Sequence, residues 1–139
     1  MALLHVEIML RGGGASNPSA REFLALMEVT AEDGLATYCA EEPWGAAGVT
    51  FVKVGLEECE AADMPHEELQ SRIHAGLRQA ADWLNRRASQ VEAARNRGLK
   101  PDIFVSGWTD QDQFDLELPS EFLLACGRVG LPISICTND

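Results

Sequence analysis

Residues 65–97 read PHEELQSRIHAGLRQAADWLNRRASQVEAARNR, and this stretch indicates the class of fold. Its apolar residues recur every three or four positions, which predicts one long helix with a continuous apolar stripe. The stripe consists of Leu69, Ile73, Leu77, Ala80, Leu84, Ala88 and Val91. Pro65 and the acids that follow it suit a helix start, and Gly98 marks the end. A helix with one apolar face needs a second layer to cover that face.

Strand patterns surround this helix. Apolar and polar residues alternate over residues 3–10, so Leu4, Val6, Ile8 and Leu10 face one way while His5, Glu7 and Met9 face the other. Further strands are predicted at residues 35–40, 48–54, 102–107, 114–118 and 131–136.

Two shorter helices complete the prediction. Asn17-Pro18 favours a helix that ends near residue 28, and a strand over 23–30 is the alternative. A second short helix opens at residues 119–121 and carries Phe122. The chain is thus expected to be one α+β domain over residues 1–139, in the order β-α-β-β-α-β-β-α-β. Its sheet is antiparallel or mixed, with helices on one face.

Charge is distributed unevenly along the chain. Twenty-two acidic residues and eleven basic ones give a net charge of −11. Seven of the bases lie in residues 66–100, so the long helix is basic and the rest of the chain acidic. Such a surface repels nucleic acid and anionic membranes and attracts a basic protein. The alternative is that acidity only maintains solubility. Glu7 interrupts the apolar run of a signal peptide, so we expect a cytoplasmic protein.

No catalytic or metal-binding motif is apparent. The glycines at residues 12–14 lack the spacing of phosphate-binding and dinucleotide-binding loops. His66 and His74 are eight residues apart on one helix, about 12 Å, which is too far to share a metal ion. Cys126 lies among apolar residues, which predicts a buried, unreactive thiol. We therefore expect neither an enzyme nor a bound cofactor or metal.

Acidic residues beside tryptophan are the remaining feature. An aromatic anchor among charges is typical of a protein-binding surface. The candidate partner-binding residues are Trp108, Asp110, Asp112, Asp115, Trp44, Glu41, Glu42, Glu57, Glu58 and Glu60. The loop at residues 110–115 lacks the glycine and the distal glutamate of a calcium-binding loop. A solvated turn, or a tryptophan that caps the core, is the alternative at each site.

The second half of the chain resembles a family of small bacterial domains of unknown function. The resemblance rests on residues 103–107 (IFVSG), 114–119 (FDLELP), 122–123 (FL) and 130–135 (GLPISI). In size and acidity the chain is also similar to immunity proteins of interbacterial toxin systems. That similarity implies an antitoxin-like protein that neutralises a basic toxin domain. The alternative function is a small enzyme or ligand-binding domain, with its site on the sheet face near residues 12–14.

Overall fold

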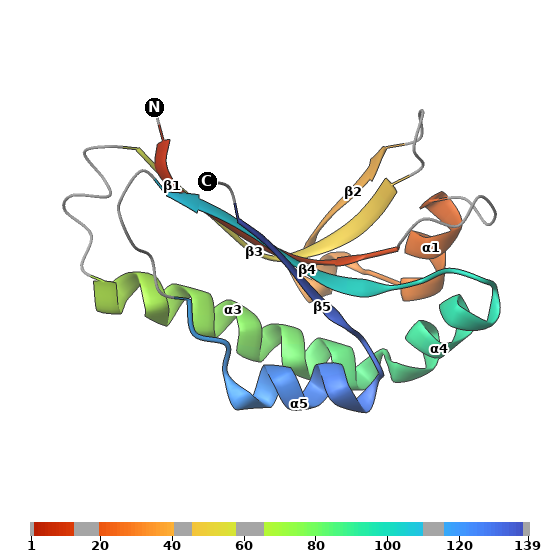
Figure 1. Ribbon diagram of the computed structural model, residues 1–139. Helices are drawn as coiled ribbons and strands as arrows, with labels where there is room; N and C mark the ends of the chain where they lie inside the picture. The colour runs from red at the N-terminus through yellow and green to blue at the C-terminus, as the bar shows by residue number, and fades with distance from the viewer. Residues whose placement is uncertain (1, 13–19, 41–45, 58–65, 110–115, 138–139) are drawn as a thin grey trace.

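A computed structural model describes residues 2–12, 20–40, 46–57, 66–109 and 116–137 (Figure 1). Its elements are β1 (Ala2–Arg11), α1 (Ala20–Met27), the 3-10 turn η1 (Ala31–Asp33), β2 (Ala36–Ala40), β3 (Ala46–Glu57), α3 (His66–Arg86), α4 (Ala88–Asn96), β4 (Asp102–Thr109), α5 (Ser120–Arg128) and β5 (Ile133–Thr137). The α+β class predicted from the sequence is confirmed.

The strands form one mixed sheet in the order β2-β3-β1-β4-β5. Every neighbouring pair is antiparallel except β4 and β5, which are parallel and are connected through α5. Helices α3 and α5 run side by side beneath the sheet in Figure 1, and α1 lies at one end of the sheet. Because β1 is central, its alternating side chains separate a buried face from an open one.

The core lies between the sheet and the helices. Val6, Ile8 and Leu10 of β1 are buried there, as their alternation predicts. A β-bulge in β3 adds Phe51 between the residues that pair with Ile8 and Met9. The ring of Phe51 makes edge contacts with Trp83 of α3 and Phe122 of α5, with centroids 5.8 and 6.4 Å apart. The bulge thereby joins β3 to both helices of the layer beneath the sheet.

The predicted long helix divides at Arg87 into α3 and α4. Arg87 leaves helical geometry, with φ −106° and ψ 14°. Six of the seven stripe residues are buried as predicted, but Ala88 is exposed because it begins a new helix with a different direction. The prediction of one uninterrupted helix is therefore wrong, although its apolar face is correct.

The structure also bears on two further predictions, one for residues 20–27 and one for residues 114–118. Residues 20–27 form α1, so the helix is confirmed over the strand alternative, and Gly34 follows η1 in the left-handed region. The strand expected at 114–118 is absent from residues 116–118, and 114–115 lie outside the described residues. Leu116 and Leu118 pack against the core from an extended segment instead, so their alternation reflects burial and not strand pairing.

Candidate interaction surface

The open face of the sheet carries the side chains that alternate with the core. They include Glu7, Met9 and Arg11 of β1, Lys53 of β3, Phe104 and Ser106 of β4, and Ser134 and Cys136 of β5. Met9 is buried between its neighbours on this face, while the others are half-buried or exposed. This face is therefore a polar surface with partly accessible aromatic and sulfur-containing side chains.

An ion pair occupies the end of the open face nearest the glycine run. The guanidinium of Arg11 donates through Nε and Nη2 to the two carboxylate oxygens of Asp102, at 2.9 and 2.6 Å. It also lies 4.0 Å from the ring centroid of Phe104. The Arg11 guanidinium is the cation best placed to bind a phosphate beside residues 12–14, but the Asp102 carboxylate already accepts its hydrogen bonds.

Gly12 has a packing role. A Cβ atom at this position would lie 2.8 Å from the ring of Phe23, so α1 can approach β1 only if residue 12 is glycine. Together with the Arg11–Asp102 pair, this contact weakens the alternative of a ligand site near the glycine run. Residues 13 and 14 lie outside the described part of the chain.

Sheet topology places the last residues of β3 and β4 on the two sides of the first residues of β1. Strands β3 and β4 flank β1 and both run antiparallel to it, so Glu57 pairs with Ala2 and Thr109 pairs with Leu4. These two strand ends are about 10 Å apart, which is two strand spacings. Segments 58–65 and 110–115, which continue from them, contain six acidic residues: Glu58, Glu60, Asp63, Asp110, Asp112 and Asp115. We call this end of the sheet the acidic end.

Two of the ten predicted partner-binding residues, Glu57 and Trp108, lie in the described part of the chain. Trp108 belongs to β4 and pairs with His5, so the strand predicted at residues 102–107 is longer than expected and includes this residue. Its sequence neighbours Gly107 and Thr109 extend β4 because β1 is long enough to pair with them. Eight predicted residues lie outside the described residues: Glu41, Glu42, Trp44, Glu58, Glu60, Asp110, Asp112 and Asp115. Segment 41–45 joins β2 to β3 at the opposite end from Glu57.

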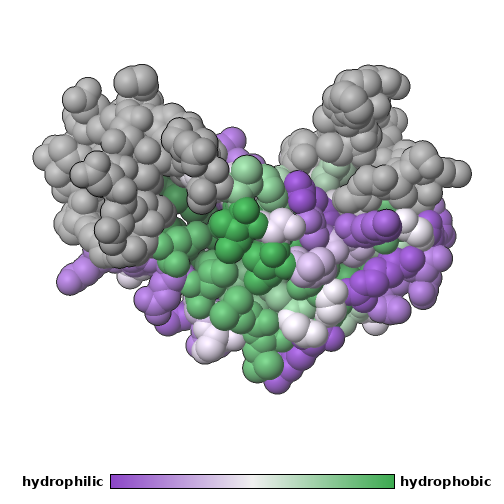
Figure 2. Space-filling model, in the orientation of Figure 1, coloured by the Kyte–Doolittle hydropathy of each residue, from purple (hydrophilic) through white to green (hydrophobic). Residues whose placement is uncertain are grey.

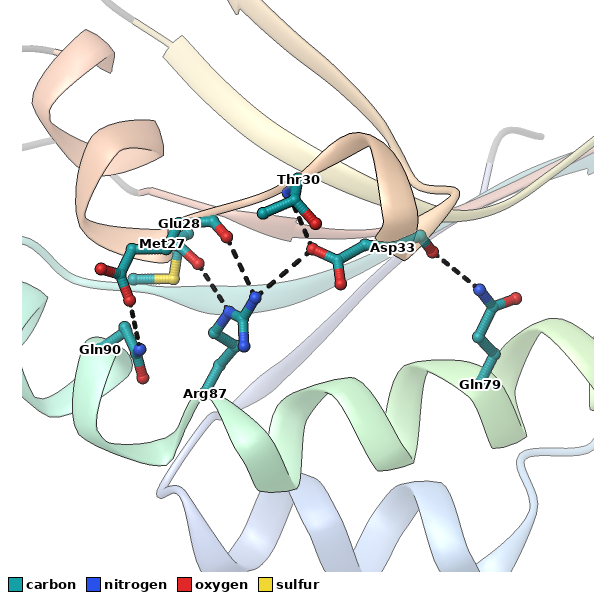
Figure 3. A network of polar contacts seen from close by, with 7 residues as sticks. All are labelled: Met27, Glu28, Thr30, Asp33, Gln79, Arg87 and Gln90. Atoms are coloured by element: carbon teal, nitrogen blue, oxygen red, sulfur yellow. Dashed lines mark hydrogen bonds and ion pairs between the residues drawn. The ribbon is translucent and has the colours of Figure 1, made fainter.

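A polar network links α1 and η1 to the break between α3 and α4 (Figure 3). Arg87 donates to the backbone oxygens of Met27 and Glu28 at 2.8 and 3.0 Å, and it lies 3.4 Å from the Asp33 carboxylate. Gln79 donates to the backbone oxygen of Asp33 at 2.9 Å. These contacts fasten the α1–β2 connection to the helix layer.

The Asp33 carboxylate is only 6% exposed. The backbone N–H of Thr30 donates to it at 2.8 Å and lowers its pKa, and the Trp83 indole and the Arg87 charge act in the same direction. The indole nitrogen of Trp83 is buried and has no hydrogen bond of standard geometry. Because the carboxylate is enclosed by donors from its own fold, we assign this network a structural role and not a catalytic one.

The two thiols described here differ in environment. Cys126 is buried, and burial raises its pKa to about 11, which makes it a poor nucleophile at neutral pH. The predicted burial of this thiol is confirmed. Cys136 is exposed on β5. Across the described residues, no group of three or more His, Cys, Asp or Glu side chains is arranged to hold a metal ion.

Basic side chains are largely engaged within the fold. Six pairs join Arg11 to Asp102, Lys53 to Glu7, Arg72 to Glu68, Arg87 to Asp33, Arg95 to Glu92, and Arg97 to Glu22. Each pair uses one acid and one base, so these six leave sixteen acids and five bases from the totals of twenty-two and eleven. The net charge of −11 therefore resides in the acids outside these pairs.

Comparison of the chain with protein-family models, characterised proteins and solved structures finds no match. Among the helices that the structure describes, none combines the length and the apolar character needed to cross a membrane.

Sequence reasoning missed three features of these surfaces. The Arg11–Asp102 pair joins residues 91 positions apart, and only the register of β1 and β4 brings them together. The sequence offered only a weak indication of the role of Arg87, namely the presence of Trp83 four residues earlier. In the structure the Arg87 guanidinium lies 5.4 Å from the centroid of the Trp83 ring. The third feature is the exposure of the Ile135 side chain on β5.

Proposed function

We propose that this protein is a non-enzymatic binding protein whose acidic end neutralises a basic protein partner. A toxin domain of the kind held by an immunity protein is the most specific form of this proposal. The observation that carries it is the common end of β3 and β4, from which two segments with six acids continue.

Charge supports the choice of a basic partner. Each ion pair within the fold combines one acid with one base, so the net charge of −11 is unchanged by pairing and attracts an opposite charge. Complementary charge accelerates association more than it increases affinity, and salt weakens the effect. A partner should therefore bind quickly at low salt and more slowly as the salt concentration rises.

The alternative of a ligand-binding or enzymatic site on the open sheet face has weaker support. Its most suitable cation, Arg11, is held by Asp102. The adjacent Gly12 is required for the packing of Phe23. Neither residue needs a ligand to explain its position.

The test is affinity capture from the native host, followed by binding kinetics. We expect a partner with a basic isoelectric point, and an association rate that falls in the double variant Asp110→Asn/Asp112→Asn. The matched control, Glu32→Gln/Asp82→Asn, removes the same charge from exposed sites on η1 and α3.

The variant Trp108→Ala tests how much the Trp108 ring contributes to the binding of the partner. If the ring is an anchor of the interface, its loss should increase dissociation and cost about 2 kcal/mol or more. The proposal fails if the captured partner is acidic. It also fails if the two double variants bind with equal association rates at low salt.

A further inference from the structure

The free edge of β5 has the features of a self-association surface. Among the strands that the structure describes, β5 pairs only with β4 and forms one edge of the sheet. Its sequence from Ile133 to Thr137, ISICT, contains neither a charge nor a proline. Protected edge strands usually carry one of these features, because unpaired backbone groups otherwise attract another strand.

Exposed apolar side chains occur on β5 and on α5, the helix that precedes it in the chain. Three large hydrophobic residues in the described part of the chain are exposed: Leu123 (44%), Leu124 (54%) and Ile135 (64%). The first two belong to α5 and the third to β5. Figure 2 shows apolar residues gathered in the middle of the face where Figure 1 draws β5 over β4.

The backbone of β5 defines which groups are unpaired. Ile103 donates its N–H to the carbonyl oxygen of Pro132 at 2.9 Å, and Ile103 is the register partner of Ile133. Because successive residues of a strand direct their backbone groups to opposite sides, residues 132, 134 and 136 face β4. Ile133, Ile135 and Thr137 therefore direct their N–H and C=O groups away from the sheet.

We propose that a second copy of this chain covers the edge by antiparallel pairing of β5 with β5 about a two-fold axis at Ile135. Ile135 is the middle residue of the strand, so this register pairs Ile135 with its mate and Ile133 with Thr137 of the other copy. Each outward backbone group then finds a partner, and the two sheets become continuous.

The two-fold axis of such a pair is perpendicular to the sheet, so both helix layers lie on the same side. Ile135 has Val105, a core residue, as its register partner and so also lies on the helix side. The two Ile135 side chains thus lie opposite each other on the helix side of the continuous sheet.

Charge favours this occupant over a different one. In a chain of net charge −11, most surfaces of two copies repel each other, whereas residues 129–137 are uncharged. A basic partner gains nothing from an uncharged edge. The proposed dimer does not use the acidic end. Its formation should therefore persist at salt concentrations that weaken an electrostatic complex.

Sedimentation equilibrium of the full chain over a range of concentrations is the first test. We expect a monomer–dimer equilibrium. Ile135→Lys places two like charges opposite each other and should raise the dissociation constant by more than about tenfold. Ile135→Val, which keeps a β-branched apolar residue, should retain the dimer. Circular dichroism and the melting temperature of the dilute protein show whether each variant is folded.

Cross-linking tests the register. In the proposed pairing Ser134 lies opposite Cys136 of the other copy, with Cα atoms about 4.5 Å apart, which permits a disulfide. The two Cys136 residues are about 8 Å apart, too far for one. Ser134→Cys should therefore give an oxidised dimer with the bond between residues 134 and 136 by peptide mapping, and the parent chain should not. A parent chain that is monomeric throughout overturns the proposal. So does a dimer that Ile135→Lys leaves intact, or a Ser134→Cys dimer without that bond.

Discussion

Replacing Gly76 by alanine should destabilise the protein, although alanine is the better helix former. Gly76 lies in the middle of α3, where the helix passes over β3. A Cβ atom there would lie 2.8 Å from Cγ2 of Val52 and 3.2 Å from the carbonyl oxygen of Phe51. Both neighbours belong to the core, and one of the contacts is to backbone, so neither can move away without disturbing the bulge in β3.

The magnitude follows from two opposing effects. Alanine stabilises a helix interior by about 0.8–1 kcal/mol relative to glycine. Overpacking of a close-packed core costs about 1–3 kcal/mol. The net effect of Gly76→Ala is therefore a loss of about 0–2 kcal/mol in the free energy of unfolding.

Gly127 provides a matched control. It is also helical, in α5, but nothing lies within 4 Å of the position that a Cβ atom would occupy. Gly127→Ala should stabilise the protein by about 0.5–1 kcal/mol. Because the gain in helix propensity is similar in the two variants, the difference between them of about 1–3 kcal/mol measures the close approach of α3 to β3.

The assay is urea unfolding followed by circular dichroism, with the slope compared between variants to verify that the same surface is exposed on unfolding. A Gly76→Ala variant as stable as Gly127→Ala, or more stable, would refute the packing of α3 on β3 at this point.

Three further predictions concern the core, the polar network and the thiols. Leu84→Ala should cost about 2–5 kcal/mol in urea unfolding because Leu84 is fully buried, whereas Ala88→Gln should change stability by less than about 0.5 kcal/mol because Ala88 is exposed. The pKa of Asp33 lies below its ordinary value of 3.8, so its charge contributes stability above that pH, and the contribution is lost as the pH falls through the folded-state pKa. As the pH is lowered below 3.8, the free energy of unfolding should therefore fall less steeply for Asp33→Asn than for the parent protein. A thiol reagent should modify Cys136 in the dilute folded protein and Cys126 only on unfolding, and mass spectrometry that finds Cys126 modified first would contradict its burial.

The spacing of apolar residues along the sequence predicted the core correctly where an element buries one of its faces. The alternation in β1 and the helical spacing from Leu69 to Val91 both identified core residues, because each element places one side against the same apolar layer. The same reasoning failed at residues 116–118, since alternation also arises in an extended segment that packs on a helix without joining a sheet.

The candidate site was harder to predict than the core. The acidic residues could be identified in the sequence, but which of the strand ends that precede them lie at the same end of the sheet depends on the strand order. The acidic segments after Glu57 and after Thr109 continue from the two strands that flank β1, whereas segment 41–45 follows β2, whose last residue lies toward the other end of the sheet. A sequence pattern gives the faces of a strand and carries no information on which strand becomes its neighbour.

The sequence by itself determined the α+β class, the apolar face of each main element and the excess of acid, because these depend on composition and on contacts between residues close in the chain. Only the tertiary structure decided the break at Arg87, the Arg11–Asp102 pair, the common end of β3 and β4, and the position of β5 at the edge of the described sheet. Each of these depends on contacts or strand neighbours from distant parts of the chain. Such contacts are selected by the packing of the whole core, and no short stretch of residues specifies them.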